Sequence, residues 1–187
     1  MDLYFVTSNK NKLEEVRVCL NKQIHQIDME ITEIQGTKEE IAFDKLRKAC
    51  KLNLNKYVMI DDTSIEIEAL NGFPGPYGKD FLKIGVECIE NLVSKAGRQT
   101  VASCIIGLGI MKDNGEFVYK LFSGEVRGKI VPGKQGGCGF NNVFLPDGCN
   151  KVYGNMSVKE KSLVSHRGLA IKKMKEYIVK NRIFEMS

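Results

Sequence analysis

Leu3-Tyr-Phe-Val-Thr-Ser-Asn-Lys-Asn-Lys12 is the stretch from which the fold class follows. Residues 3–7 are β-prone, and Ser8-Asn9 are residues that favour turns. Apolar side chains at Leu13, Val16 and Leu20 then follow at helical spacing. The sequence therefore opens with a predicted strand, tight turn and helix, a unit typical of α/β folds.

Further strands and helices are expected along the first half of the chain. We expect a strand over 30–34, a helix opened by a capping box at Thr37-Lys-Glu-Glu40, a strand over 57–60 ending at Asp61-Asp-Thr63, and a helix reaching Leu92 after the turn-rich stretch 71–78. These elements alternate between strand and helix. That alternation favours a sheet with helices packed on it.

The second half is richer in β-prone residues. Strands are predicted over 101–111, 117–122 and 125–131, with a hairpin turn at Asp113-Asn-Gly115 and a glycine-rich loop over 133–139. Ser157-Val-Lys-Glu160 is a second capping box, and a last helix is expected from Ser165. We predict one domain spanning residues 1–187, of the mixed α/β class, with a central sheet flanked by helices.

Composition narrows the class of protein. The chain has 187 residues, 43% hydrophobic and 27% charged, values ordinary for a soluble globular domain. No apolar run approaches the roughly 20 residues of a membrane span, and the N-terminus lacks a signal peptide pattern, so a cytoplasmic protein is expected. The net charge of +5 suits an anionic partner. The cysteines form no C-x-x-C pair, so free thiols are expected rather than a zinc site.

The turn after the first strand is a candidate phosphate site. Backbone N–H groups at a helix start are unpaired, and the helix dipole favours an anion there. Side chains over residues 7–12 add hydroxyl, amide and ammonium donors, from Thr7, Ser8, Asn9, Lys10, Asn11 and Lys12. An ordinary helix cap with surface lysines explains the same residues.

Acidic residues suggest a metal site. Asp61 and Asp62 follow an apolar strand, where α/β folds commonly place their sites, and Glu33 follows another predicted strand. Carboxylates facing a bound phosphate would repel it unless a cation intervened, and Mg²⁺ binds through one or two carboxylates plus phosphate oxygens. Strand ends capped in solvent are the alternative. Ser165-His-Arg167 is likewise either a helix cap or a contact to a base or phosphate.

Four segments in one order resemble a known family. They are Thr7-Ser-Asn-Lys-Asn-Lys-Leu-Glu-Glu-Val16, Asp61-Asp-Thr63 with Leu70-Asn-Gly-Phe-Pro-Gly-Pro-Tyr77, Gly139-Phe140 with Phe144-Leu-Pro-Asp-Gly148, and Glu160-Lys161 with Ser165-His-Arg-Gly168. Together they resemble the inosine triphosphate pyrophosphatase family, also called Ham1-like, over nearly the whole chain. The resemblance implies a two-lobed α/β fold with a cleft between the lobes, and a homodimer.

The resemblance also implies an activity and a set of site residues. The implied reaction converts ITP, dITP or XTP and water into the monophosphate and pyrophosphate, with Mg²⁺ as cofactor and Mn²⁺ as a substitute. It implies that residues 7–12 hold the triphosphate, with Lys12 stabilising the transition state, and that Glu33 and Asp62 bind the metal. Asp62 would be the base for the attacking water, beside Thr63. Lys45 and Lys79 would lie near the phosphates, and Cys138, Gly139, Phe140, Asn141, Lys161, His166 and Arg167 near the base.

Departures from the family pattern affect base selectivity. The family usually has Glu at the position of Asp61 in this chain. It usually has the pattern aromatic-Gly-aromatic-Asp-Pro where this chain has Cys138-Gly-Phe-Asn-Asn142. An amide can turn over and offer either oxygen or NH₂, so we expect Asn141 to discriminate less sharply than an acid, and Asn141→Asp to widen the preference for ITP over ATP. Two rivals remain: a Maf-like pyrophosphatase of other specificity, and a nucleotide- or RNA-binding protein without turnover. No membrane or stable nucleic-acid partner is expected.

Overall fold

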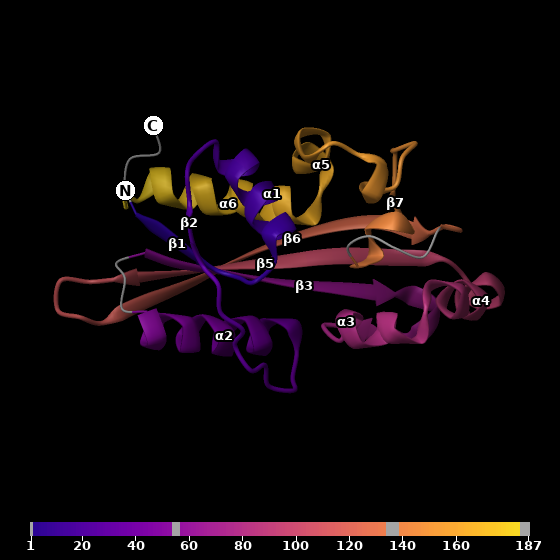
Figure 1. Cartoon of the computed structure of the whole chain (residues 1–187), viewed down its shortest axis with the longest axis horizontal. Coiled ribbons are helices and arrows are strands. Elements are labelled where there is room, and N and C mark those ends of the chain that lie inside the picture. The colour runs from indigo at the N-terminus through magenta and orange to yellow at the C-terminus, as the bar shows by residue number, and fades with distance from the viewer. Residues whose placement is uncertain (1, 54–56, 134–138, 184–187) are drawn as a thin grey trace.

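A seven-stranded mixed sheet forms the centre of the molecule (Figure 1). The structure is a computed structural model, which describes residues 2–53, 57–133 and 139–183. Three long antiparallel strands dominate the sheet: β3 (Tyr57–Ile67), β5 (Gln99–Met111) and β6 (Phe117–Ile130). Four short strands complete it: β1 (Leu3–Val6), β2 (His25–Ile27), β4 (Pro74–Gly75) and β7 (Phe144–Pro146). The strand order is β2-β1-β3-β5-β6-β7, and β4 pairs with β3.

Helices cover both faces of this sheet, as Figure 1 shows. On one face lie α1 (Lys10–Leu20), α5 (Val158–Val164) and α6 (His166–Lys180), and on the other lies α2 (Lys38–Asn53). The far end carries α3 (Gly78–Phe81) and α4 (Val86–Ala96). Single turns of 3₁₀-helix are η1 (Glu68–Leu70), η2 (Leu82–Ile84), η3 (Gly139–Asn142) and η4 (Tyr153–Asn155). The predicted α/β class with a flanked central sheet is confirmed.

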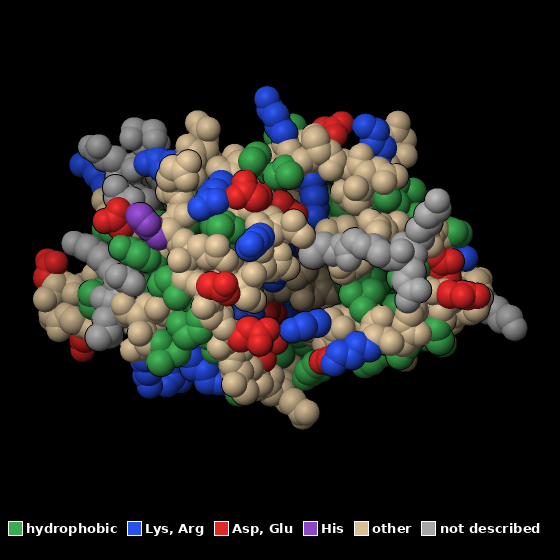
Figure 2. Space-filling view, viewed as in Figure 1, with side chains coloured by type: hydrophobic (Ala, Val, Ile, Leu, Met, Phe, Trp, Pro, Cys, Tyr) green, Lys and Arg blue, Asp and Glu red, His purple; other side chains and the backbone are tan. Residues whose placement is uncertain are grey.

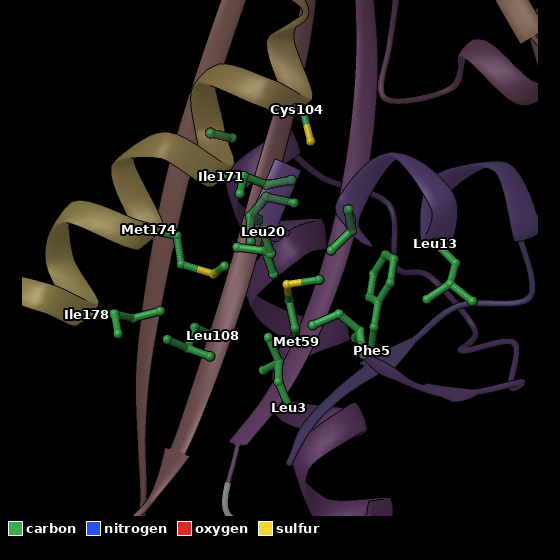
Figure 3. Packing of buried hydrophobic residues seen from close by; sticks show 14 residues of the cluster. Leu3, Phe5, Leu13, Leu20, Met59, Cys104, Leu108, Ile171, Met174 and Ile178 are labelled. Atoms are coloured by element: carbon green, nitrogen blue, oxygen red, sulfur yellow. The ribbon is translucent and has the colours of Figure 1, made fainter. Parts of the chain in front are cut away.

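Buried apolar side chains form a separate cluster on each face of the sheet. Between the sheet and α1 and α6, Phe5, Met59 and Met174 pack together (Figure 3). Between the sheet and α2, Ile60 and Leu46 are fully buried. Successive strand residues point to opposite faces. Met59 and Ile60 therefore enter different clusters, and the same alternation governs the two aspartates that follow them.

Close packing of α6 on β6 depends on a glycine. A Cβ atom at Gly124 would lie 2.1 Å from the backbone oxygen of His166 and 2.6 Å from the backbone nitrogen of Ala170. Both contacts are to backbone, which cannot rotate away as a side chain can. Gly124 thus lets the N-terminal half of α6, which carries His166 and Arg167, approach the sheet.

Both predicted capping boxes are present. The Thr37 amide donates to Glu40 Oε2 over 2.9 Å, and the Glu40 amide donates to Thr37 Oγ1 over 3.2 Å at the start of α2. Ser157 and Glu160 make the same reciprocal pair before α5. The hairpin at 113–115 is also confirmed, with the Lys112 amide donating to the Glu116 oxygen over 2.8 Å. Local side-chain chemistry was sufficient to place these elements.

Four sequence predictions were wrong in detail. Residues 30–34 are not a strand; the strand in that region is β2, and Ile31 instead packs irregularly against the cluster under α2. The predicted strands 117–122 and 125–131 are one strand, β6, because Gly124 continues its pairing with β5. The helix expected to reach Leu92 is broken at Gly85, whose φ of 89° no helix accommodates. The strand expected to end before Asp61 continues to Ile67.

Candidate active site

A cavity of about 650 Å³ opens beside β3, a volume suited to a small-molecule ligand. Figure 2 shows acidic and basic side chains around a hollow near the middle of this face. The position follows from the strand pairing. β1 pairs with β3 as far as Met59, and β4 pairs from Ile65, so among the described residues positions 61–64 have no strand beside them on this edge. Side chains from both faces of β3 can reach this gap.

Most of the predicted site residues line this one cavity. They are Thr7, Ser8, Asn9, Asn11, Lys12, Glu33, Lys45, Thr63, Lys79, Gly139, Phe140, Asn141, Lys161, His166 and Arg167. Lys10 is exposed and does not line it. Asp62 is not part of the lining but bonds to Lys45, which is. Cys138 lies outside the described residues. Asp61, a candidate carboxylate of the predicted metal site, lines the cavity as well, and so does Glu15, which was not predicted.

The turn between β1 and α1 is capped by its own side chains. Asn9 Oδ1 accepts from the backbone amides of Asn11 and Lys12 at 3.0 and 3.2 Å, and Thr7 Oγ1 accepts from the Asn9 amide at 3.1 Å. The two alternatives for this segment therefore coincide, because a capped helix start also faces the cavity. Lys12 pairs with Asp61, and Ser8, Lys10 and Asn11 are exposed.

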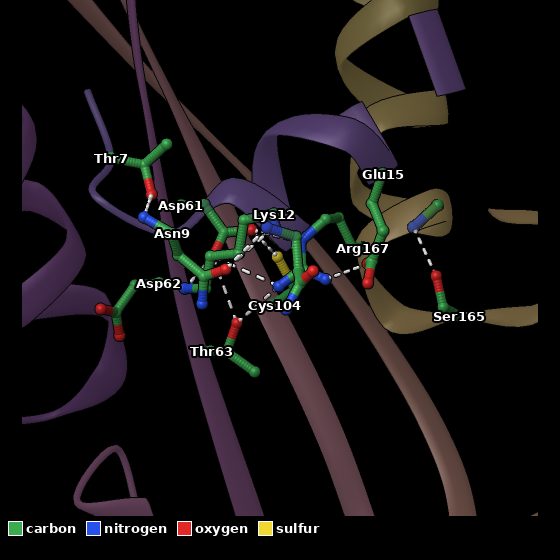
Figure 4. A network of polar contacts seen from close by, with 12 residues as sticks. Thr7, Asn9, Lys12, Glu15, Asp61, Asp62, Thr63, Cys104, Ser165 and Arg167 are labelled. Atoms are coloured by element: carbon green, nitrogen blue, oxygen red, sulfur yellow. Dashed lines mark hydrogen bonds and ion pairs between the residues drawn. The ribbon is translucent and has the colours of Figure 1, made fainter. Parts of the chain in front are cut away.

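Asp61 is the centre of a buried polar cluster on the α1 and α6 side (Figure 4). Its carboxylate accepts from Arg167 Nε at 2.7 Å and from Cys104 Sγ at 3.2 Å, and it forms an ion pair with Lys12. Burial alone would favour the neutral acid, but Arg167 and Lys12 outweigh burial and hold the pKa of Asp61 well below its usual value. Asp61 is therefore a permanent anion that fixes two cationic side chains.

Glu15 completes this cluster from α1. Its Oε1 lies 2.7 Å from Lys161 Nζ, and its Oε2 pairs with Arg167. Glu15 is 8% exposed, so two buried cations share it. Sequence analysis missed this residue, but its spacing contained a signal. Glu15 lies three residues after Lys12, on the same helical face.

Asp62 occupies a different environment on the α2 side. Lys45 Nζ lies 3.2 Å from Asp62 Oδ1 and 2.6 Å from Glu33 Oε1, so one ammonium joins the two carboxylates. Burial raises the pKa of Asp62, and the nearby Glu33 raises it further, while Lys45 and Lys12 only partly offset them. Figure 4 shows Asp62 directed away from the Asp61 cluster. The adjacent aspartates thus have opposite pKa shifts.

The Glu33 and Asp62 pair fits a magnesium ion. A cation already bridges their oxygens, so the two carboxylates converge on one point. No group of three or more acidic, histidine or cysteine side chains suited to a metal occurs within the described residues. Mg²⁺ needs no such group, because it is commonly bound by one or two carboxylates together with phosphate oxygens of a substrate.

The other end of the cavity is apolar. Ile65, Leu82, Phe140, Phe144 and Tyr153 line it and belong to one hydrophobic cluster. This end could stack a flat aromatic ring. The end of the cavity with Lys12 and Lys45 suits phosphate groups, and together with this apolar end it matches the polarity of a nucleotide.

Polar side chains at the apolar end are engaged with one another. Lys161 Nζ donates to Asn141 Oδ1 over 3.1 Å, so the amide expected to turn over freely is held in one orientation. Arg167, expected near the base or phosphate, directs its guanidinium to Asp61, Glu15 and Thr63. His166 Nδ1 is buried and has no partner among the described residues. Burial, reinforced by Arg167 and Lys161, lowers the pKa of His166 well below its usual value, so the imidazole is neutral.

No helix in the described ranges has both the length and the apolar character to cross a membrane.

Lys79 is largely exposed, with Nζ 3.7 Å from Glu30 Oε1. The described cysteines, Cys19, Cys50, Cys88, Cys104 and Cys149, are free thiols.

Comparisons with known proteins agree with this architecture. The chain is 42% identical over 186 residues to an inosine triphosphate pyrophosphatase of Encephalitozoon intestinalis, covering 98% of this chain and 95% of that protein. It is 33% identical to an inosine triphosphate pyrophosphatase of Schizosaccharomyces pombe, covering 94% of each. The solved Ham1 protein of Staphylococcus aureus superposes with a TM-score of 0.74 at 28% identity, covering 95% of this chain and 99% of that one.

A second solved structure shows the same fold. It is a HAM1 protein of Coxiella burnetii, with a TM-score of 0.77 at 23% identity, covering 95% of this chain and 99% of that one. The model of the Ham1 family matches residues 3–177, nearly the full length. The chain belongs to the Ham1 family.

Proposed function

We propose that the chain hydrolyses ITP, dITP and XTP to the monophosphate and pyrophosphate, and so removes non-canonical purine nucleotides. The observation that carries this proposal is that Asp61 and Asp62, beside one cavity, have opposite pKa shifts. The pKa of Asp61 is lowered and that of Asp62 is raised, and the cavity has a basic end and an apolar end. Relatives named inosine triphosphate pyrophosphatase support it. We propose further that residues 1–187 form one domain, and that the protein is a cytoplasmic homodimer.

Lys45 and Lys12 would bind the triphosphate at the basic end. In the absence of substrate each ammonium is paired with an aspartate, Lys45 with Asp62 and Lys12 with Asp61. Phosphate oxygens would compete for these ammonium groups. Lys45 is the group that joins Asp62 to Glu33, so its shift to phosphate would free both carboxylates to hold a cation beside the substrate. The N-terminus of α1 would add its dipole.

Asp62 would accept the proton of the attacking water. A carboxylate with a raised pKa is a better proton acceptor than an ordinary one. The water oxygen bonds to the α-phosphorus, the bond from that phosphorus to the bridging oxygen breaks, and pyrophosphate leaves. Lys12 would stabilise the negative charge that builds on the phosphate oxygens. Glu33 and Asp62 would hold Mg²⁺, or Mn²⁺ in its place, and the ion supplies further charge neutralisation at these oxygens.

Neither rival function has an observation of its own in this structure. A binding protein without turnover would not need Asp62 and Glu33 to converge on one cation. A Maf-like enzyme of other specificity would not need the Lys161 and His166 end of the cavity, which contains segments shared with the Ham1 family.

The test is the identity of the bond that is cleaved. The protein is incubated with ITP, XTP, GTP and ATP and Mg²⁺ in ¹⁸O-labelled water, and products are resolved by mass spectrometry. We expect IMP and pyrophosphate from ITP, with the label in IMP, because attack is at the α-phosphorus. IDP with orthophosphate, or label in pyrophosphate, would refute the proposal. Asp62→Asn should slow the reaction by roughly 10² or more, and Asp147→Asn, an exposed matched control, should leave it unchanged.

A further inference from the structure

Lys45 joins the two carboxylates that would hold the metal. Its Nζ lies 2.6 Å from Glu33 Oε1 and 3.2 Å from Asp62 Oδ1, and its side chain is only 16% exposed. An ammonium group carries a positive charge and N–H donors but no acceptor. It therefore satisfies one oxygen of each carboxylate at the point on which they converge. A cation of the protein itself lies between the two expected metal ligands.

The two carboxylates are held in place independently of this ammonium. Asp62 belongs to β3, and its pairing with β5 fixes the backbone there. Glu33 lies in an irregular segment, but Lys48 Nζ, one turn further along α2, donates to the backbone oxygen of Thr32 over 2.8 Å. The segment that carries Glu33 is thus tied to α2 by a second lysine. If the Lys45 ammonium moved away, both carboxylates would remain close enough to share a cation.

Free Mg²⁺ would have to compete with Lys45 for these oxygens. The ion gives up its water reluctantly and is usually bound by one or two carboxylates only together with phosphate oxygens of a substrate. Lys45 would in turn lose both of its charged partners, and separating a largely buried ion pair is costly. An ion that arrives without phosphate therefore gains little and must break the contacts of Lys45.

A polyphosphate ligand would remove this obstacle. Lys45 lines the cavity, as does Lys12 from the first helix. Phosphate oxygens would offer the Lys45 ammonium a new charged partner. They would also supply the additional oxygen ligands that Mg²⁺ commonly takes. One ligand would thus release the two carboxylates and complete the coordination of the ion.

We propose that Lys45 excludes free Mg²⁺ from the Glu33 and Asp62 pair, so that the ion enters with a polyphosphate ligand or after it. This inference rests on the proposed function, because it takes these two carboxylates as the metal ligands. It gives Lys45 a role besides its contact with phosphate, namely control of the order in which ion and substrate bind. Without a polyphosphate, the charge of the pair is neutralised by the protein itself.

Binding of Mn²⁺, followed by electron paramagnetic resonance, tests this exclusion without turnover. Mn²⁺ alone is titrated into the unmodified protein and into Lys45→Met, a change that keeps the length of the side chain and removes its charge. We expect Lys45→Met to bind Mn²⁺ roughly tenfold more tightly, within the usual range of coupling between two binding events. Lys51→Met removes the same charge from an exposed position of α2 and should leave the affinity unchanged. Adding Glu33→Gln to Lys45→Met should abolish the gain.

A second measurement uses the unmodified protein, so it remains decisive even if Lys45→Met does not fold. The ¹⁵N resonance of the Lys45 ammonium, identified by its loss in Lys45→Arg, is followed by NMR. Millimolar Mg²⁺ alone should leave this resonance in place. Inorganic tripolyphosphate should shift it, because phosphate oxygens replace the carboxylates as its partners.

Four results would each overturn the proposal. They are equal Mn²⁺ affinity in the unmodified protein and Lys45→Met, the same gain in Lys51→Met, a gain that survives Glu33→Gln, and a Lys45 resonance that Mg²⁺ alone shifts or tripolyphosphate does not. None of these measurements requires hydrolysis. A failure of the proposed function would appear separately, as IDP with orthophosphate or as no reaction in the product analysis.

Discussion

Replacing each of the two adjacent aspartates by asparagine should separate stability from activity. Asp61 is buried and pairs with Arg167 and Lys12, and the pKa of Asp61 is well below its usual value. Asp61→Asn keeps the volume but leaves these cations short of a negative charge. Removing one partner of a buried ion pair costs about 3–5 kcal/mol. Arg167 retains Glu15 and Lys12 is partly exposed, so we expect a cost of about 3 kcal/mol, at the lower end of that range.

Asp62→Asn should behave in the opposite way. Burial raises the pKa of Asp62, so ionising it in the folded state opposes folding. This cost grows as the pH rises above the pKa that Asp62 has in the unfolded chain. A neutral amide removes this cost but also removes a partner of Lys45. We expect the free energy of unfolding to change by less than about 1 kcal/mol. Pyrophosphate release from ITP should fall by roughly 10² or more, the scale of a lost acid-base group.

Urea unfolding and pyrophosphate release are measured on both variants. At this chain length, a loss of about 3 kcal/mol should also lower Tm by about 6–12 °C in Asp61→Asn. The reasoning would be refuted if Asp62→Asn were the less stable variant, or if Asp61→Asn unfolded at the unmodified midpoint. Near-normal turnover in Asp62→Asn would assign the base to another group.

Two further variants test the packing of α6. The unfolded chain protonates His166 near the ordinary histidine pKa of about 6.5, whereas burial keeps it neutral in the folded state, so stability should fall below that pH by up to about 1.4 kcal/mol per pH unit. Urea midpoints are measured from about pH 7.5 to 5, a range that brackets this pKa. The fall in stability with falling pH should disappear in His166→Gln and remain in His25→Gln, a change at an exposed position. Equal pH dependence in the unmodified protein and both variants would contradict the role of His166. Gly124→Ala should cost about 3 kcal/mol, because its Cβ overlaps the α6 backbone, and an unchanged midpoint would show that α6 can shift freely.

Elements with local signals were predicted well from the sequence. Reciprocal caps at Thr37 and Ser157, the hairpin at 113–115 and the apolar spacing of α1 depend on residues within a few positions of each other. Errors arose where tertiary contacts decide the structure. The strand β3 was expected to end at Asp61-Asp-Thr63, and carboxylates are seldom buried. It continues because Arg167 and Lys12, distant in sequence, neutralise that carboxylate.

The same limit applies to the site. Residue types and order located most of the side chains that line the cavity, because the motifs at 7–12 and 165–167 are continuous in sequence. The pairing among them was not accessible. Glu15 and Lys161 are separated by 146 positions, and Lys161 donates to both Glu15 and Asn141. A pattern of residue types cannot show which donor already has an acceptor.

The strand pairing explains why two neighbouring aspartates can serve different purposes. In the middle of a sheet, Asp61 and Asp62 would face separate compartments and could not serve one cavity. Here β1 ends its pairing at Met59 and β4 begins at Ile65, and the gap gives access to both faces of β3. Asp61 can then anchor Lys12 and Arg167 from α1 and α6, while Asp62 reaches Lys45 from α2. The partners of Asp61 lie on one face of the sheet and the partner of Asp62 lies on the other, so the two carboxylates keep different pKa values. A longer β1 would pair with β3 beyond Met59 and close the gap beside the two aspartates.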